Sequence, residues 1–184
     1  MSTTTETKYS VAKTLVECYK LRSDVPGKWC DITIDAGLRS GMISISCDYG
    51  KWGNNWGSFG TDFKEFLCEL DMEYLAKKFG EDKEFDLKGT CATWLHYAKE
   101  NYEGEELLDI SQEISQCEYS CNTQEDIVSR LVHLNRGDRI MKMYEGIPPI
   151  AQRVSRRFQS FYNEMWPVFI SEIKKEIAER TSNA

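Results

Sequence analysis

The segment from Asp48 to Leu67, DYGKWGNNWGSFGTDFKEFL, separates two parts of the chain that have different periodicity. Before it, apolar and polar residues alternate as in β-strands. After it, apolar residues recur every three or four positions as in helices. The segment holds four glycines and six aromatic residues: Tyr49, Trp52, Trp56, Phe59, Phe63 and Phe66. We therefore expect a joint between sheet and helices, with the rings in the core and Gly57 and Gly60 in the turn.

The part before this segment predicts an antiparallel sheet. Trp29–Asp35 and Met42–Asp48 alternate between apolar and polar residues, and the glycine-flanked loop Ala36–Gly41 joins them as a hairpin. Tyr9–Leu21 also alternates, so a strand is favoured there and a helix stays an alternative. Lys51–Trp56 adds a further strand.

The part after Gly60 predicts helices throughout. The expected helical stretches are Phe63–Leu70, Asp71–Phe79, Leu87–Tyr102, Leu107–Cys117, Ile127–Leu134, Ile150–Met165 and Phe169–Ile177. The residues placed to cap them are Asp62 with Glu65, Asp86 and Thr123 at the starts, and Gly80, Gly104 and Gly137 at the ends. Ile147-Pro148-Pro149 interrupts the series, and Pro167 either starts a helix or kinks one.

Strands followed by helices indicate the α+β class. We expect a small antiparallel N-terminal sheet packed against a C-terminal helical region. Residues 8–60 should form mainly strands and residues 61–180 mainly helices. The length of 184 residues fits a single domain over 1–184.

The net charge of −7 is concentrated in the middle of the chain. Thr61–Asp126 holds 18 Asp and Glu residues against 6 Lys and Arg residues. This excess argues against binding of nucleic acid or anionic membranes through that region. It fits a solvated helical surface and, as an alternative, a surface that meets a basic partner.

The seven cysteines indicate a reducing compartment. Their number is odd, their spacing is irregular and no CxxC occurs. Met1–Tyr19 lacks the basic start and apolar run of a signal peptide, and no apolar run approaches membrane-spanning length. We therefore expect reduced thiols, mostly in the core, and a cytoplasmic protein.

Patterns for metal binding and nucleophilic catalysis are weak. Cys117, Cys121 and His133 give three candidate zinc ligands where four are usual, so helix packing is the favoured explanation. His96 and His133 are the only histidines, and no GxSxG motif accompanies them. The sequence contains neither GxxxxGK[ST] nor GxGxxG. No cofactor and no metal are therefore expected.

Trp52 and Trp56 admit two interpretations. Aromatic residues on a sheet can stack on bases or form a ligand-binding surface. Only Lys51 and Lys64 lie nearby, however, and a site for a polyanion should be basic. Core packing is favoured over an aromatic ligand surface. The cluster Arg153, Arg156 and Arg157 is expected to pair within the protein, although arginines can also bind phosphate.

The chain resembles a family of bacteriophage and prophage accessory proteins over about two thirds of its length, discontinuously. The residues that carry the resemblance are Ile43–Gly50, Trp52, Trp56-Gly57, Gly60, Phe63–Leu67, Leu70-Asp71, Tyr74, Lys78-Phe79, Phe161-Tyr162 and Trp166–Ile170. These motifs carry no known chemistry, so no catalytic residue is transferred. The resemblance implies an accessory protein that acts in the host bacterial cytosol.

By analogy, small acidic phage proteins of this kind often inhibit host defence machinery, CRISPR effectors included. The leading hypothesis is a non-catalytic anti-CRISPR-like inhibitor that binds a host defence protein or ribonucleoprotein complex. Direct sequence-specific nucleic acid binding is not expected. The candidate contact residues are Glu69, Glu73, Glu81, Asp82, Glu105, Glu106 and Asp109.

Three alternatives stay open. One is a small-ligand or nucleotide-binding module at Trp52, Trp56 and the turn from Gly57 to Gly60. Another is a hydrolase that uses His96 or His133 with nearby carboxylates. The last is a phage structural or assembly accessory protein.

Overall fold

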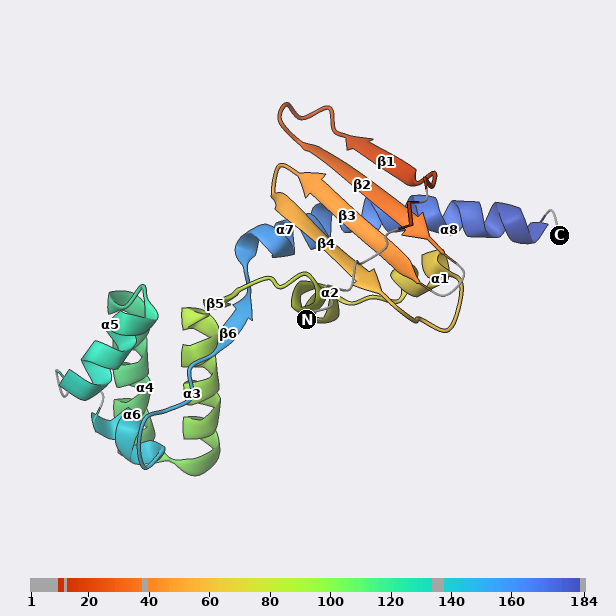
Figure 1. Cartoon of the computed structure of the whole chain (residues 1–184). Coiled ribbons are helices and arrows are strands. Elements are labelled where there is room, and N and C mark those ends of the chain that lie inside the picture. The colour runs from red at the N-terminus through yellow and green to blue at the C-terminus, as the bar shows by residue number, and fades with distance from the viewer. Residues whose placement is uncertain (1–9, 12, 38–39, 134–137, 183–184) are drawn as a thin grey trace, which may run out of the picture. The chain divides into compact units, whose positions relative to one another are not determined.

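The computed structural model describes residues 10–11, 13–37, 40–133 and 138–182, with the side chain of His133 left aside (Figure 1). These residues form two compact units. Unit 1 contains the described residues up to Gly80 and those from Arg157 onward, and unit 2 is Glu81–Arg156. Each unit is described by itself below, and the expectation of a single domain stays a prediction.

Unit 1 is built on a four-stranded antiparallel sheet in which neighbouring strands are consecutive in the chain. The strands are β1 (Glu17–Arg22), β2 (Trp29–Ala36), β3 (Gly41–Cys47) and β4 (Gly50–Trp56). The α+β class and the N-terminal sheet are thus confirmed. The first strand is shorter than expected, because the described residues before Glu17 form no strand.

One face of this sheet forms the core of unit 1. Ile32 pairs with Ile45, and Ile34 with Ile43, so that four isoleucines lie side by side and fully buried. Their neighbours on the opposite face are exposed, as Ser44 is, or half-buried, as Thr33 is. This alternation is the one that the sequence pattern predicts for a sheet with one face in the core and one face toward solvent.

The helices of unit 1 are α1 (Phe63–Cys68), α2 (Met72–Lys78), α7 (Arg156–Glu164) and α8 (Trp166–Ser182), and Figure 1 shows α8 running behind the sheet. Asp62 caps α1 by accepting a hydrogen bond from the Lys64 amide at 2.9 Å. Gly80 follows α2 and has a φ of 66°, in the left-handed region. This conformation agrees with the prediction that Gly80 ends the helix. Pro167 is the second residue of α8, so it starts a helix and does not kink one.

Trp52 and Trp56 lie in the core, at 7% and 5% exposure. The ring of Trp52 packs at 5.1 Å from Phe158 and 4.9 Å from Phe161, both on α7. Trp56 packs at 5.9 Å from Phe63 on α1. Each ring is covered by helices, as the favoured interpretation of core packing predicts.

Lys64 is buried beside the sheet, at 2% exposure. Its ammonium donates to Glu17 of β1 at 2.6 Å and to Glu176 of α8, and Tyr19 donates to the same two carboxylates. These hydrogen bonds overcome the effect of burial and raise the pKa of Lys64 above its usual value. The cluster therefore ties β1, α1 and α8 together through one charged group.

Unit 2 is mainly helical. Its elements are β5 (Lys83–Phe85), α3 (Leu87–Asn101), α4 (Gly104–Ser120), α5 (Gln124–Val128), the π-helix η1 (Ser129–His133), α6 (Asp138–Met143) and β6 (Gln152–Val154). The core is formed by Cys91, Trp94, Ala98, Ile110, Ile114, Cys117, Cys121, Ile127, Leu131, Ile140 and Met143. The indole of Trp94 donates to the carbonyl of Pro149 at 2.8 Å.

Several expectations for this part of the chain need correction. The antiparallel pair β5–β6 lies where only helix was predicted, and the expected helix Ile150–Met165 begins at Arg156. Helix α6 was not predicted. Thr123 and Asp126 form the capping box of α5, as the position of Thr123 suggested. The expected end of that helix at Leu134 and Gly137 lies outside the described residues.

The alternation of β3 can be tested with two neighbouring residues. Ile45→Ala should lower the free energy of unfolding by about 2–4 kcal/mol, because it leaves a cavity in the isoleucine face. Ser44→Ala, on the exposed face of the same strand, should stay within about 0.5 kcal/mol. Urea unfolding followed by circular dichroism measures both. Equal effects would contradict the orientation of this strand.

The Lys64 cluster predicts a pH-dependent loss of stability. Lys64→Met should lower the free energy of unfolding by about 2 kcal/mol near neutral pH, because Glu17 and Glu176 lose their shared cation. Burial would raise the pKa of Glu17, but hydrogen bonds from Lys64 and Tyr19 hold it below its usual value of 4.5. A carboxylate of this kind contributes stability above its unfolded pKa and loses it as the pH falls through its folded pKa.

The penalty of Lys64→Met should therefore shrink below about pH 4. Urea unfolding of the wild type and the variant at both pH values measures the difference. Lys51→Met, on the exposed face of β4, is the matched control and should show little change at either pH. A penalty that does not depend on pH would contradict the role of the carboxylates.

Candidate functional site

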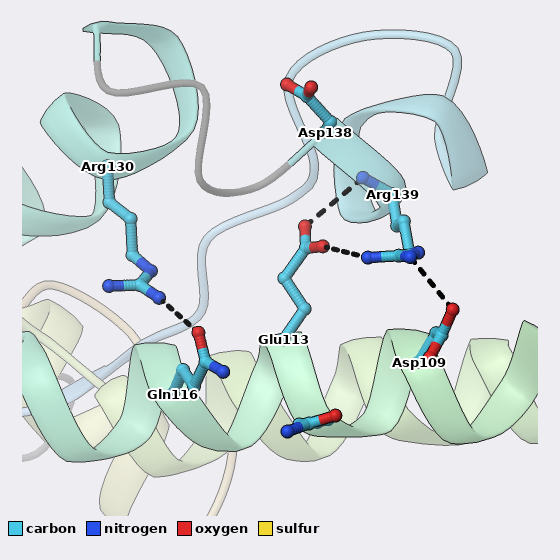
Figure 2. A pocket seen from close by; sticks show the side chains of 7 residues that line it. Asp109, Glu113, Gln116, Arg130, Asp138 and Arg139 are labelled. Atoms are coloured by element: carbon cyan, nitrogen blue, oxygen red, sulfur yellow. Dashed lines mark hydrogen bonds and ion pairs between the residues drawn. The ribbon is translucent and has the colours of Figure 1, made fainter.

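A polar pocket of about 480 Å³ lies in unit 2 between α4, η1 and α6 (Figure 2). Its volume is in the range of small-ligand sites. The residues that line it are Asp109, Gln112, Glu113, Gln116, Arg130, Asp138 and Arg139. Two arginines and three carboxylates thus meet in one cavity, which makes it the candidate site of this unit.

Glu113 organises one side of the pocket. It is only 9% exposed, and the other buried residues of α4 are the apolar Ile110, Ile114 and Cys117. Its carboxylate accepts hydrogen bonds from the amides of Arg139 and Ile140, at 3.2 and 3.3 Å. These amides belong to the first turn of α6, whose N–H groups have no partner within the helix. Glu113 therefore fixes the start of α6 against α4.

The guanidinium of Arg139 completes this side of the pocket. It donates to Asp109 at 2.8 Å and lies 3.8 Å from the second oxygen of Glu113 (Figure 2). Both carboxylates on α4 therefore share one arginine. Their charges are therefore balanced in part within the protein.

Arg130 forms the other side of the pocket, and it is held differently. It lies on η1 at 9% exposure, and its guanidinium donates to Gln116 at 2.9 Å and to Ser120 at 3.0 Å. Its Nε is buried and has no hydrogen-bond partner among the described residues. Both partners of Arg130 are neutral, unlike those of Arg139.

The sequence contains two signals of buried polar contacts in this region, but it does not indicate the pocket itself. Glu113 interrupts the apolar series of α4 beside Ile114, and Arg130 stands next to the buried Leu131. A charged residue in an apolar helical stripe signals a buried polar contact. Which carboxylate meets which arginine depends on the packing of α4, η1 and α6, which periodicity does not give.

The seven predicted contact residues do not lie on one unit. Glu69 and Glu73 are exposed in unit 1, whereas the other five lie in unit 2. Glu105 and Glu106 are exposed in the first turn of α4, and Asp109 follows them as the ion-pair partner of Arg139. Asp82 is exposed and Glu81 is half-buried, where it accepts a hydrogen bond from the hydroxyl of Ser155.

The candidates for catalysis and metal binding are placed as follows. His96 is exposed on α3, 3.4 Å from Glu100, and does not line the pocket of Figure 2. The side chain of His133 lies outside the described residues. Cys117 and Cys121 are buried in the core of unit 2. In the described part of the chain, no group of three or more His, Cys, Asp or Glu side chains is placed to hold a metal ion.

Two further features of the described residues bear on partners. Arg153 lies 3.5 Å from Asp86, so at least one arginine of the Arg153, Arg156 and Arg157 cluster pairs within unit 2. None of the helices in the described ranges has both the length and the apolar character needed to span a bilayer.

Comparison with known proteins places the chain in a family. Residues 9–179 match the sequence model of Phage_phiTE_072, which is described as a phage family. The match spans most of the chain, and the protein therefore belongs to this phage family. The phage part of the resemblance is thus confirmed. No curated protein and no solved structure shows a significant match.

The contacts of Glu113 predict its effect on stability. Glu113→Ala should lower the free energy of unfolding by about 2 kcal/mol, because it leaves two amides of α6 without their acceptor and removes one of the two carboxylates beside Arg139. Glu113→Gln should cost less, since the amide oxygen can still accept a hydrogen bond. Urea unfolding followed by circular dichroism measures both.

The matched control is Glu118→Ala, which removes an exposed carboxylate from the same helix. It should stay within about 0.5 kcal/mol of the wild type. If Glu113→Ala costs no more than Glu118→Ala, the carboxylate does not hold α6 in place.

Proposed function

We propose that this phage protein binds and inhibits a host defence protein or ribonucleoprotein complex in the bacterial cytosol, without catalysis, through an acidic surface of unit 2. The observation that carries the proposal is the distribution of charge between the two units. Unit 2 holds 15 Asp and Glu residues against 9 Lys and Arg residues, whereas the rest of the chain holds 15 against 14. Nearly all of the net charge of −7 thus belongs to unit 2.

The turn between α3 and α4 is the strongest part of this surface. Glu100, Glu103, Glu105 and Glu106 are all exposed there, within seven consecutive residues. The last two lie in the first turn of α4, where the helix dipole favours negative charge. The buried contacts of α3 and α4 hold these carboxylates on a helical hairpin.

An ordered acidic surface suits a basic partner. Complementary charge accelerates encounter and disfavours partners of the same sign. Proteins that bind nucleic acid present basic grooves, and an acidic helical hairpin can occupy such a groove in place of the phosphate backbone. A defence complex that holds RNA or DNA is therefore the class of partner that this surface fits best.

Affinity capture from a bacterial host that expresses defence complexes tests the proposal. The wild type should retain a partner, and added salt should weaken the complex because surface charges are screened. The pair Glu105→Lys and Glu106→Lys should weaken binding at least about tenfold, through slower association. Inhibition of the captured complex is then measured in its own activity assay.

The control reverses the same amount of charge elsewhere. Glu172→Lys with Glu179→Lys changes two exposed carboxylates of α8 in unit 1. This pair should leave the affinity within about twofold, since it lies outside the proposed surface. An equal loss in both double variants, or no retained partner across several defence systems, would overturn the proposal.

A further inference from the structure

Arg130 is a nearly buried cation without a charged partner. Of the ion pairs formed by the described residues, none includes it, and its two hydrogen bonds go to the side-chain oxygens of Gln116 and Ser120. Its Nε carries a proton that no described acceptor takes. A guanidinium stays charged at any ordinary pH, so burial cannot be relieved by loss of its proton.

Among the described residues, none of the three carboxylates that line the pocket forms an ion pair with Arg130. Asp109 and Glu113 bind Arg139 and the start of α6. Burial raises the pKa of the Cys117 thiol to about 11, although the charge of Arg130 opposes this effect. Cys117 is therefore a neutral thiol near pH 7 and does not balance the arginine.

An unbalanced buried charge is unfavourable, since desolvation costs several kcal/mol unless a partner of opposite sign is supplied. Here the cation lines an open cavity of about 480 Å³, so the partner can come from solution. Arg130 also belongs to a π-helix, a rare element that occurs frequently at functional sites. The burial of this cation and the cavity beside it point to a ligand.

We propose that the pocket between α4, η1 and α6 binds a small molecule through an anionic group, a carboxylate or a phosphate, which pairs with Arg130. Guanidinium groups bind both kinds of anion through parallel N–H donors. Gln112 and Gln116 of α4 also line the pocket and offer further hydrogen bonds to a ligand. The proposal does not rest on the acidic surface proposed above, although Asp109 lines the pocket and is also a candidate contact residue of that surface.

The other lining residues limit what can bind. Asp138 contributes a third carboxylate to the pocket, so that among the described lining residues three carboxylates stand against two arginines. A polyanion would meet net repulsion there. A compact ligand with one anionic group meets less of this repulsion and can offer hydroxyl or amino donors to Asp138.

A titration followed by nuclear magnetic resonance tests the site in the full chain. Inorganic phosphate and acetate are added separately, each against sodium chloride of equal ionic strength. The Arg130 Nε–H signal and amides of α4, η1 and α6 should shift and saturate with at least one probe. Saturation with one probe alone identifies which of the two anionic groups the pocket takes.

Arg130→Met keeps the length of the side chain and removes its charge, so the saturable shifts should be lost. Lys142→Met removes an exposed cation of α6 that does not line the pocket, and it should titrate like the wild type. If Arg130→Met does not fold, Arg130→Lys provides the second test, with affinity reduced at least about fivefold by loss of the planar donors.

Linear, non-saturating shifts with both probes would overturn the proposal. So would saturable shifts that persist in Arg130→Met. Loss of binding in Lys142→Met to the same degree would also overturn it, since the effect would then reflect net charge alone.

Discussion

The fold of unit 1 depends on the burial of one face of the N-terminal sheet by the C-terminal helices. Four isoleucines of β2 and β3 form this face, and Trp52 continues it on β4. Phe158 and Phe161 of α7 pack on Trp52, while Phe169 of α8 packs at 5.1 Å from Tyr19 of β1. Without α7 and α8, a large apolar surface would stay in water, so the end of the chain has to return to its beginning.

This return of the chain explains why unit 2 lies in the middle of the sequence, between the two segments of unit 1. The chain leaves unit 1 after α2 and re-enters it at α7, so both ends of Glu81–Arg156 belong near each other. The pair β5–β6 meets this requirement within unit 2, since Lys83 lies opposite Val154. Two strands of three residues each are then sufficient to close a helical insertion, which has its own core around Trp94 and Ile114.

The sequence predicts the parts of the fold that local patterns specify. Alternation over Trp29–Asp35 and Met42–Asp48 gives β2 and β3, and Asp62 marks the start of α1. The strands β5 and β6 are too short to show a period, so pairing across the insertion decides them. The same holds for the pocket: neither the ion pair of Arg139 with Asp109 nor the missing partner of Arg130 can be read from spacing along the chain.

Unit 2 thus combines an acidic exterior with one buried cation that lacks a counter-charge. Both features favour a small anion over a nucleic acid as a ligand of unit 2. At physiological salt, repulsion from surface carboxylates fades beyond about 8 Å, so the opposition that a small anion meets at Arg130 comes mainly from the carboxylates that line the pocket. A nucleic acid carries its charges along the whole backbone and meets the exposed carboxylates wherever it lies on the surface. The proposed pocket and the proposed acidic surface are therefore compatible: the pocket takes one anionic group, and the surface repels a nucleic acid, whose negative charge it shares.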